Sequence, residues 1–109
     1  MALSPDGKAV VMGGSETVKL WEVATGTVRA MLHHDHLVIA MACSPNSSLV
    51  ATASIDRTAK LWETATGKLK ATLKGHENEV FSVAFSPDGS TIATGSEGVV
   101  FLWDVPGKG

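Results

Sequence analysis

Four consecutive residues form the densest group of metal-ligating side chains in the sequence: His33, His34, Asp35 and His36. Imidazole nitrogens and carboxylate oxygens are ligands that zinc and similar metals accept, so a metal-binding loop is one interpretation of this stretch. The other interpretation is a solvated loop between strands in which one histidine has a structural role. We favour the second interpretation, and the sequence therefore predicts no metal and no cofactor.

Cys43 and the pair Gly67-Lys68 could also carry chemistry, as a nucleophile and as a phosphate-binding loop. A reactive thiol needs an electropositive and partly exposed site, whereas Cys43 stands among apolar residues, where a free cysteine is commonly a small core side chain. The phosphate-loop motif requires an earlier glycine and a following helix, and the residues around Gly67 match neither requirement. No catalytic pair of acids is evident, so we expect a protein that is not an enzyme.

Composition and charge argue against several classes of protein. Of the 109 residues, 44% are hydrophobic and 18% are charged, which is typical of a folded chain. A net charge of −2 without a basic stripe gives no reason to expect nucleic acid or a membrane surface as a partner. The longest apolar run, residues 37–43, is too short to cross a bilayer. With one cysteine and no visible secretory signal, we expect a cytoplasmic protein.

The strongest signal in the sequence is an internal repeat. Trp21, Trp62 and Trp103 are spaced 41 residues apart, and each lies between a leucine and an acidic residue. Three Ser-Pro pairs precede these tryptophans by 17 or 18 residues, and they begin at Ser4, Ser44 and Ser86. A fixed period of this length indicates a repeat architecture.

Within each repeat the local pattern is that of short β-strands. β-Branched and aromatic residues dominate the apolar runs, no run keeps a helical period, and Pro, Asn, Asp and Gly supply turns between them. The predicted strands lie at residues 38–43, 49–54, 59–63 and 68–73, and then at 80–85, 91–94 and 99–104. Four short strands in about 40–45 residues is the spacing of a propeller blade.

Residues 53–62, and residues 73–89 together with Leu102-Trp103-Asp104, resemble the WD-repeat family. The resemblance implies an all-β fold, a partial β-propeller of about two and a half four-stranded antiparallel WD-type blades. The first blade, with its outer three strands, would span residues 1–32, the complete middle blade 33–73, and a third blade lacking its outermost strand 74–109. A WD propeller needs at least four blades, so we expect this chain to need further blades or self-association to close a ring.

The resemblance also implies a buried structural network in each blade that links a histidine, a hydroxyl, an aspartate and the tryptophan. Its members would be His34, Thr52 or Ser54, Asp56 and Trp62 in the middle blade, with His76 and Trp103 in the third. The third blade departs from the pattern, because its turn is one residue shorter and Glu97 stands near the position of Asp56. A carboxylate taken from water needs donors, and the other members of the network supply them.

The WD-repeat binding surface often surrounds the mouth of the central channel, and five residues match its positions: Leu37, Ile39, Ile55, Glu79 and Phe81. Exposed apolar side chains beside an acid are typical of a protein contact, although Ile39 and Phe81 could instead pack between blades. The sequence thus predicts a protein–protein interaction scaffold with a protein or peptide partner. The alternatives are a metal-binding module at residues 33–36 and a non-functional fragment of a longer WD-repeat protein.

Overall fold

Eleven β-strands make up the secondary structure of residues 2–12, 17–34 and 37–105, the part of the chain that the computed structural model describes. They are β1 (Ala2–Leu3), β2 (Ala9–Met12), β3 (Thr17–Glu22), β4 (Thr27–His33), β5 (Val38–Cys43), β6 (Leu49–Ser54), β7 (Ala59–Glu63), β8 (Leu69–Leu73), β9 (Ser82–Phe85), β10 (Thr91–Ser96) and β11 (Val99–Asp104). In these ranges no helix is long and apolar enough to cross a membrane. The predicted all-β fold class is confirmed.

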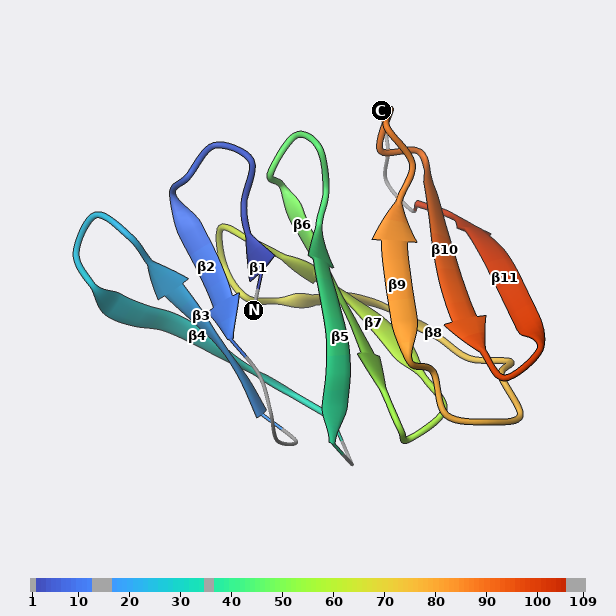
Figure 1. The fold of residues 1–109 in the computed structure, drawn as a ribbon. Coiled ribbons are helices and arrows are strands. Elements are labelled where there is room, and N and C mark those ends of the chain that lie inside the picture. Colours follow the sequence, from blue (N-terminus) through green and yellow to red (C-terminus); the bar gives the residue numbers. More distant parts are fainter. Residues whose placement is uncertain (1, 13–16, 35–36, 106–109) are drawn as a thin grey trace.

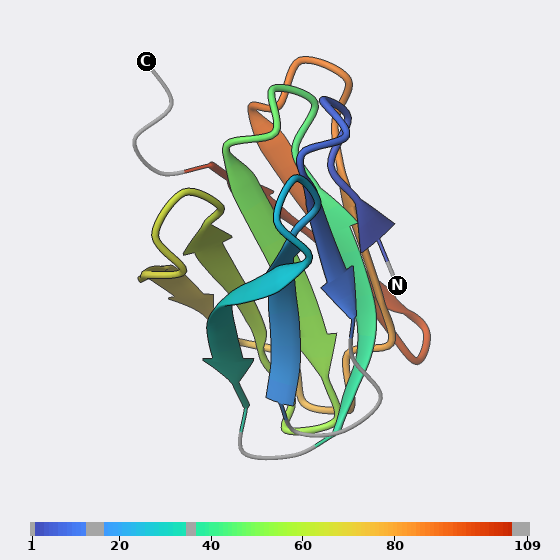
Figure 2. The same ribbon diagram turned by 90° about the vertical axis from the view of Figure 1, so that its left-hand side faces the viewer.

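The strands form three antiparallel sheets that stand side by side (Figure 1). Sheet 1 has the order β1-β2-β3-β4, sheet 2 the order β5-β6-β7-β8, and sheet 3 the order β9-β10-β11. The first strands of the sheets are neighbours, β1 beside β5 and β5 beside β9. Figure 2 looks onto sheet 1, with the other two sheets behind it. Successive meander sheets joined in this way are consecutive propeller blades, so the predicted partial propeller is confirmed.

The outer sheets differ from the middle one in their strand content. Sheet 1 has three full strands and the two-residue β1, and its β4 continues to His33, one residue past the predicted limit of the first blade. Within the described ranges no strand pairs with the outer edge of β11, where Val100 and Leu102 are 69% and 72% exposed. The limits of the second and third blades, residues 33–73 and 74–109, stay predictions.

Two strands of sheet 3 depart from their predicted limits. β9 begins at Ser82 rather than at residue 80, because the Val80 amide donates to the Ser54 carbonyl of sheet 2 at 3.1 Å. β10 extends to Ser96, which pairs with Val99 across a two-residue turn. The first difference arises where the chain passes from sheet 2 to sheet 3, so a tertiary contact decides where β9 begins. The second is local, because β10 and β11 stay paired up to their hairpin turn.

Sheet 2 is buried on both faces because it lies between the other two sheets. Every residue of β6 is buried, and alternate side chains of a strand point to opposite faces. Val50 and Trp62 pack with residues of sheet 1, whereas Ala51 and Leu61 pack with residues of sheet 3. The hydrophobic core therefore consists of two interfaces between blades.

The three Ser-Pro turns share one geometry. In the second of them, the Ser44 hydroxyl donates to the side-chain oxygen of Asn46 at 2.8 Å and accepts from the Leu49 amide at 3.0 Å. The same two bonds recur at Ser4 and Ser86, with aspartate in place of the asparagine. Each serine thus closes the hairpin between the first and second strands of its sheet, which fixes the register of that pair.

Sheets 1 and 2 are joined by a polar contact as well as by apolar packing. Arg29 of β4 donates to the Thr64 carbonyl at 2.8 Å and pairs with Glu22 at 3.1 Å. In the turn before β8, Gly67 has a φ of +74°, and a methyl group at this residue would overlap the side chain of Ala30. Glycine is therefore required at position 67 both by its backbone conformation and by the space available.

Candidate functional site

Five side chains in and around sheet 2 form a continuous hydrogen-bonded chain. The Nδ1 atom of His34, in the loop before β5, lies 3.0 Å from the Asp56 carboxylate, and its Nε2 atom lies 2.6 Å from the Thr52 hydroxyl. The indole N–H of Trp62 donates to the same hydroxyl at 3.0 Å. At the other end, the amide and the hydroxyl of Thr58 both donate to Asp56. The chain joins β6, β7, the turn between them and the loop that precedes the sheet.

One placement of the protons satisfies the whole chain. Trp62 can only donate, so Thr52 accepts from it. When His34 is neutral with its hydrogen on Nδ1, Asp56 accepts from Nδ1 and the Thr52 hydroxyl donates to Nε2. Every polar group in the network is satisfied, which offsets the cost of taking these groups out of water.

Ser54, the other hydroxyl considered for this network, holds the adjacent loop instead. Its Oγ donates to the Leu37 carbonyl at 2.9 Å and accepts from the Asp56 amide at 3.1 Å. Sheet 3 repeats the first of these contacts, where Ser96 donates to the Glu79 carbonyl at 2.9 Å. These two serines therefore fix the backbone just before the first strands of sheets 2 and 3.

Sheet 3 contains a shorter network that ends at a histidine. The Nε2 atom of His76 lies 2.7 Å from the Thr94 hydroxyl, and the indole N–H of Trp103 donates to that hydroxyl at 2.7 Å. The Nδ1 atom of His76 is buried without a hydrogen-bond partner. Sequence reasoning missed Thr94, although this residue follows His76 by the same 18 residues that separate Thr52 from His34.

The shorter turn of sheet 3 explains why His76 lacks an acceptor. The turn between β6 and β7 has four residues, 55–58, whereas the turn between β10 and β11 has two, Glu97 and Gly98. Glu97 was expected near the position of Asp56. It is exposed instead and makes no hydrogen bond with His76, because the two-residue hairpin keeps it at the surface.

Burial affects the protonation of three groups. It opposes ionisation of Asp56, but hydrogen bonds from Thr58 and His34 outweigh it and hold the pKa of that carboxyl below its ordinary value. Burial lowers the pKa of His76 and raises the pKa of the Cys43 thiol. Cys43 is half-buried against the core between sheets 1 and 2, so its thiol has little of the thiolate character that reactivity requires.

The histidine-rich stretch does not assemble a metal site in the described part of the chain. His34 uses both ring nitrogens in the network, and the Nδ1 atom of His33 lies 3.2 Å from the Thr17 hydroxyl. Asp35 and His36 lie outside the described residues. Among the residues that are described, no three metal-ligating side chains come together.

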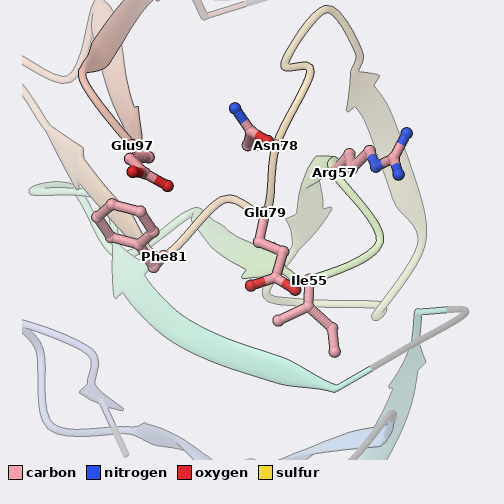
Figure 3. Close-up of a pocket in the computed structure, with 6 residues that line it drawn as sticks. All are labelled: Ile55, Arg57, Asn78, Glu79, Phe81 and Glu97. Atoms are coloured by element: carbon pink, nitrogen blue, oxygen red, sulfur yellow. The ribbon is translucent and has the colours of Figure 1, made fainter.

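The five residues predicted to bind a partner lie at the end of the sheets where β5 and β9 begin. Leu37, Ile39 and Phe81 are 39%, 40% and 52% exposed, Glu79 is also exposed, and Ile55 is half-buried. Of these five, Ile55, Glu79 and Phe81 line one hollow of about 230 Å³ between sheets 2 and 3 (Figure 3). Ile39 and Phe81 therefore lie at the surface of this chain rather than wholly between blades.

Three further residues line the hollow, and sequence reasoning did not assign them to the site: Arg57, Asn78 and Glu97. In Figure 3 the guanidinium group of Arg57 points away from the carboxylates of Glu79 and Glu97. Glu97 lies 42 residues after Ile55, and this spacing of one repeat was the signal that could have identified it. Arg57 and Asn78 are turn and loop residues without such a signal.

The three meander sheets, the spaced tryptophans and the hydrogen-bonded chain of sheet 2 define a repeat protein of the propeller class. Comparison with protein-family models agrees, because the WD domain, G-beta repeat model matches residues 26–63 and 67–104. The chain belongs to the WD-repeat family.

The chain is similar to parts of several longer proteins. It is 35% identical over 92 residues to WD repeat and SOCS box-containing protein 1 of Danio rerio, and 37% identical over 91 residues to apoptotic protease-activating factor 1 of Rattus norvegicus. It is 33% identical over 99 residues to target of rapamycin complex subunit wat1 of Schizosaccharomyces pombe. These matches cover 81%, 82% and 88% of this chain but only 22%, 7% and 32% of the three relatives. The matched region thus spans about a third of each relative or less.

Proposed function

We propose that this chain is part of a cytoplasmic protein–protein interaction scaffold and belongs to a propeller that is larger or built from several copies. WD-repeat proteins generally act in protein–protein interaction. The partner is a protein or peptide that binds where β5 and β9 begin, at Leu37, Ile39, Ile55, Glu79 and Phe81. The observation that carries the proposal is the hollow between sheets 2 and 3, which exposes an aromatic and an aliphatic side chain beside carboxylates.

The physical argument concerns the grouping of apolar surface. Single exposed apolar residues are ordinary, but several on one face beside a concave site are typical of a surface that a partner covers. Phe81 is 52% exposed, and its ring offers the kind of anchor that dominates protein interfaces. Ile55 forms the opposite wall from the turn of the preceding blade. A peptide placed here would contact two blades at once.

The test is selection from a library of random peptides displayed on phage, followed by measurement of the dissociation constants of the selected peptides. Ile55→Asn and Phe81→Asn should each weaken binding at least tenfold, because each replaces an apolar contact by a polar side chain without changing the charge of the hollow. Met31→Asn is the matched control, since Met31 is also 52% exposed but lies on β4. Equal losses in all three variants, or no loss in the first two, would contradict the proposed face.

The assembly is tested separately by the solution mass of the purified chain. The outer edge of β11 exposes Val100 and Leu102, and an unpaired strand edge recruits further strands. Light scattering that gives a defined multiple of 11.4 kDa would support completion of the propeller by copies of this chain. A well-folded, cooperatively melting monomer would contradict the need for further blades.

A further inference from the structure

Consecutive blades carry different side chains at three equivalent positions of this face. Sheet 2 presents Leu37, Ile39 and Ile55, and sheet 3 presents Glu79, Phe81 and Glu97, each 42 residues later. The face thus changes from aliphatic in sheet 2 to acidic and aromatic in sheet 3. The hollow lies at this boundary, because its lining includes Ile55 from one blade and all three residues from the next.

Backbone hydrogen bonds hold the walls of the hollow in place. The Ile55 amide donates to the Leu37 carbonyl at 3.1 Å, which fixes the wall formed by sheet 2. On the opposite side, the Phe81 amide donates to the Gly95 carbonyl at 3.0 Å. The Glu79 carbonyl accepts from Ser96 at 2.9 Å. The backbone that carries the lining side chains is therefore already fixed in the unbound chain, which reduces the entropy lost on binding.

The charge of the hollow favours a cation. Glu79 and Glu97 contribute two carboxylates, and within the described residues neither has an ion-pair partner. The one cationic side chain in the lining, Arg57, points away from both carboxylates (Figure 3). The half-exposed ring of Phe81 stands in the same lining, and an aromatic face attracts a cation at short range.

We infer that the hollow binds the side chain of a lysine or arginine in a partner peptide, next to an aliphatic residue of that peptide. This inference rests on the proposed function and names the class of peptide that the face selects. The cationic group lies between Glu79 and Glu97, its methylene stem packs on Phe81, and the neighbouring aliphatic side chain contacts Ile55. Arginine has an advantage over lysine, because its guanidinium can bridge two carboxylates and stack on a ring.

Glu79 and Phe81 stay accessible when a further blade packs against sheet 3. Sheet 3 already packs against sheet 2, and Leu37 and Ile39 of sheet 2 are still 39% and 40% exposed. Glu79 and Phe81 occupy the equivalent positions one blade later. A fourth blade placed by the same repeat geometry therefore leaves them accessible.

The test uses the phage selection described for the proposed function and compares conservative variants that remove charge without changing shape. Selected peptides should be enriched in arginine or lysine next to leucine, isoleucine or valine. Glu79→Gln and Glu97→Gln should each weaken their binding about threefold to fivefold, and the double variant about tenfold or more. The matched control is Glu77→Gln, which changes net charge equally at an exposed residue outside the hollow.

Two further readouts complete the test. Replacing the basic residue of a selected peptide by norleucine should weaken binding to the parent chain but not to the double variant. The affinity for the parent should also fall between 0.1 M and 0.5 M NaCl more steeply than the affinity for the double variant.

Failure of this inference and failure of the proposed function give different results. Peptides without basic residues that lose affinity for Ile55→Asn but not for Glu79→Gln or Glu97→Gln would overturn the inference and leave the binding face intact. Basic peptides that bind Glu77→Gln as weakly as the double variant would also overturn it, because net charge alone would then explain the preference. Selected peptides whose affinity is unchanged by Ile55→Asn and Phe81→Asn, or a selection that enriches nothing, would overturn both.

Discussion

Replacement of Thr52 by valine tests the hydrogen-bonded chain of sheet 2 at the hydroxyl that joins Trp62 to His34. Valine keeps the shape of threonine but has no hydroxyl, so the indole N–H of Trp62 loses its acceptor and the Nε2 atom of His34 loses its hydrogen-bond partner. Both groups are in the buried part of the blade, where Thr52 and the His34 side chain are 0% exposed. A buried polar group that loses its partner costs about 1–3 kcal/mol, so the two together should lower the free energy of unfolding by about 2–6 kcal/mol.

Sheet 3 provides an internal comparison. Thr94→Val removes the equivalent hydroxyl, but Trp103 is only partly buried and the network already ends at His76 without an aspartate. We therefore expect about half the loss, about 1–3 kcal/mol. Thr52→Ser keeps the hydroxyl and removes one methyl group, which should cost about 1 kcal/mol.

The assay is urea unfolding followed by tryptophan fluorescence, with NMR measurement of hydrogen exchange at the indole N–H of Trp62. Thr52→Val should lower the unfolding free energy and accelerate exchange at Trp62, while Thr94→Val should accelerate exchange at Trp103. The reasoning would be refuted if Thr52→Val were no more destabilising than Thr52→Ser. A larger loss for Thr94→Val than for Thr52→Val would refute the claim that sheet 3 has the weaker network.

Three further predictions concern the same fold. Gly67→Ala should lower the free energy of unfolding by at least about 3 kcal/mol in urea, because a positive φ and overlap with Ala30 both oppose the added methyl group. Gly26→Ala, at a φ of +69° but with open space around it, should lower it by only about 1–2 kcal/mol. Equal losses would contradict the packing argument. Burial holds the pKa of His76 in the folded chain below 6.5, so the unfolded chain binds more protons and stability should fall as the pH drops below 6.5. Thermal melts of His76→Gln should lose this dependence, and an unchanged pH profile would argue against it. The pKa of Asp56 is held below 3.8, so the stabilisation by its ionised carboxylate is present above that pH and lost as the pH falls through the folded-state pKa. The difference in unfolding free energy between the parent chain and Asp56→Asn should therefore shrink on acidification. A difference that stays constant would show that ionisation of Asp56 does not contribute.

The fold was largely predictable because the repeat carries redundant signals. The spacing of Trp21, Trp62 and Trp103 set the period, and short apolar runs between turn residues located the strands of sheet 2. The strand ends were less certain where another blade supplies the hydrogen-bond acceptor, as it does for the Val80 amide. Local patterns contain no information about such contacts between sheets.

The site was only partly predictable, and the reason differs from residue to residue. Thr52 and Ser54 lie two positions apart on one strand, so both hydroxyls point to the same face and the pattern could not separate them. Glu97 was placed only near the position of Asp56, because a shorter turn can be aligned with a longer one in more than one way. Arg57 and Asn78 line the hollow through the course of a turn and a loop, which no residue spacing encodes.

The shorter turn of sheet 3 accounts for two differences between the blades. A four-residue turn in sheet 2 carries Asp56 inward to His34, with Ile55 at the surface. The two-residue turn of sheet 3 has no position for an inward carboxylate, so the Nδ1 atom of His76 is left without a partner, while Glu97 faces the hollow. The shorter turn therefore weakens the internal network of the third blade and adds negative charge to its surface. Insertion of an aspartate between Glu97 and Gly98 should strengthen the network of sheet 3, because His76 gains an acceptor. The same insertion should leave the hollow unchanged, because Glu97 is retained. An insertion that stabilises the chain without changing the affinity for basic peptides would separate the two roles; an insertion that destabilises it would show that the unpartnered nitrogen does not result from turn length.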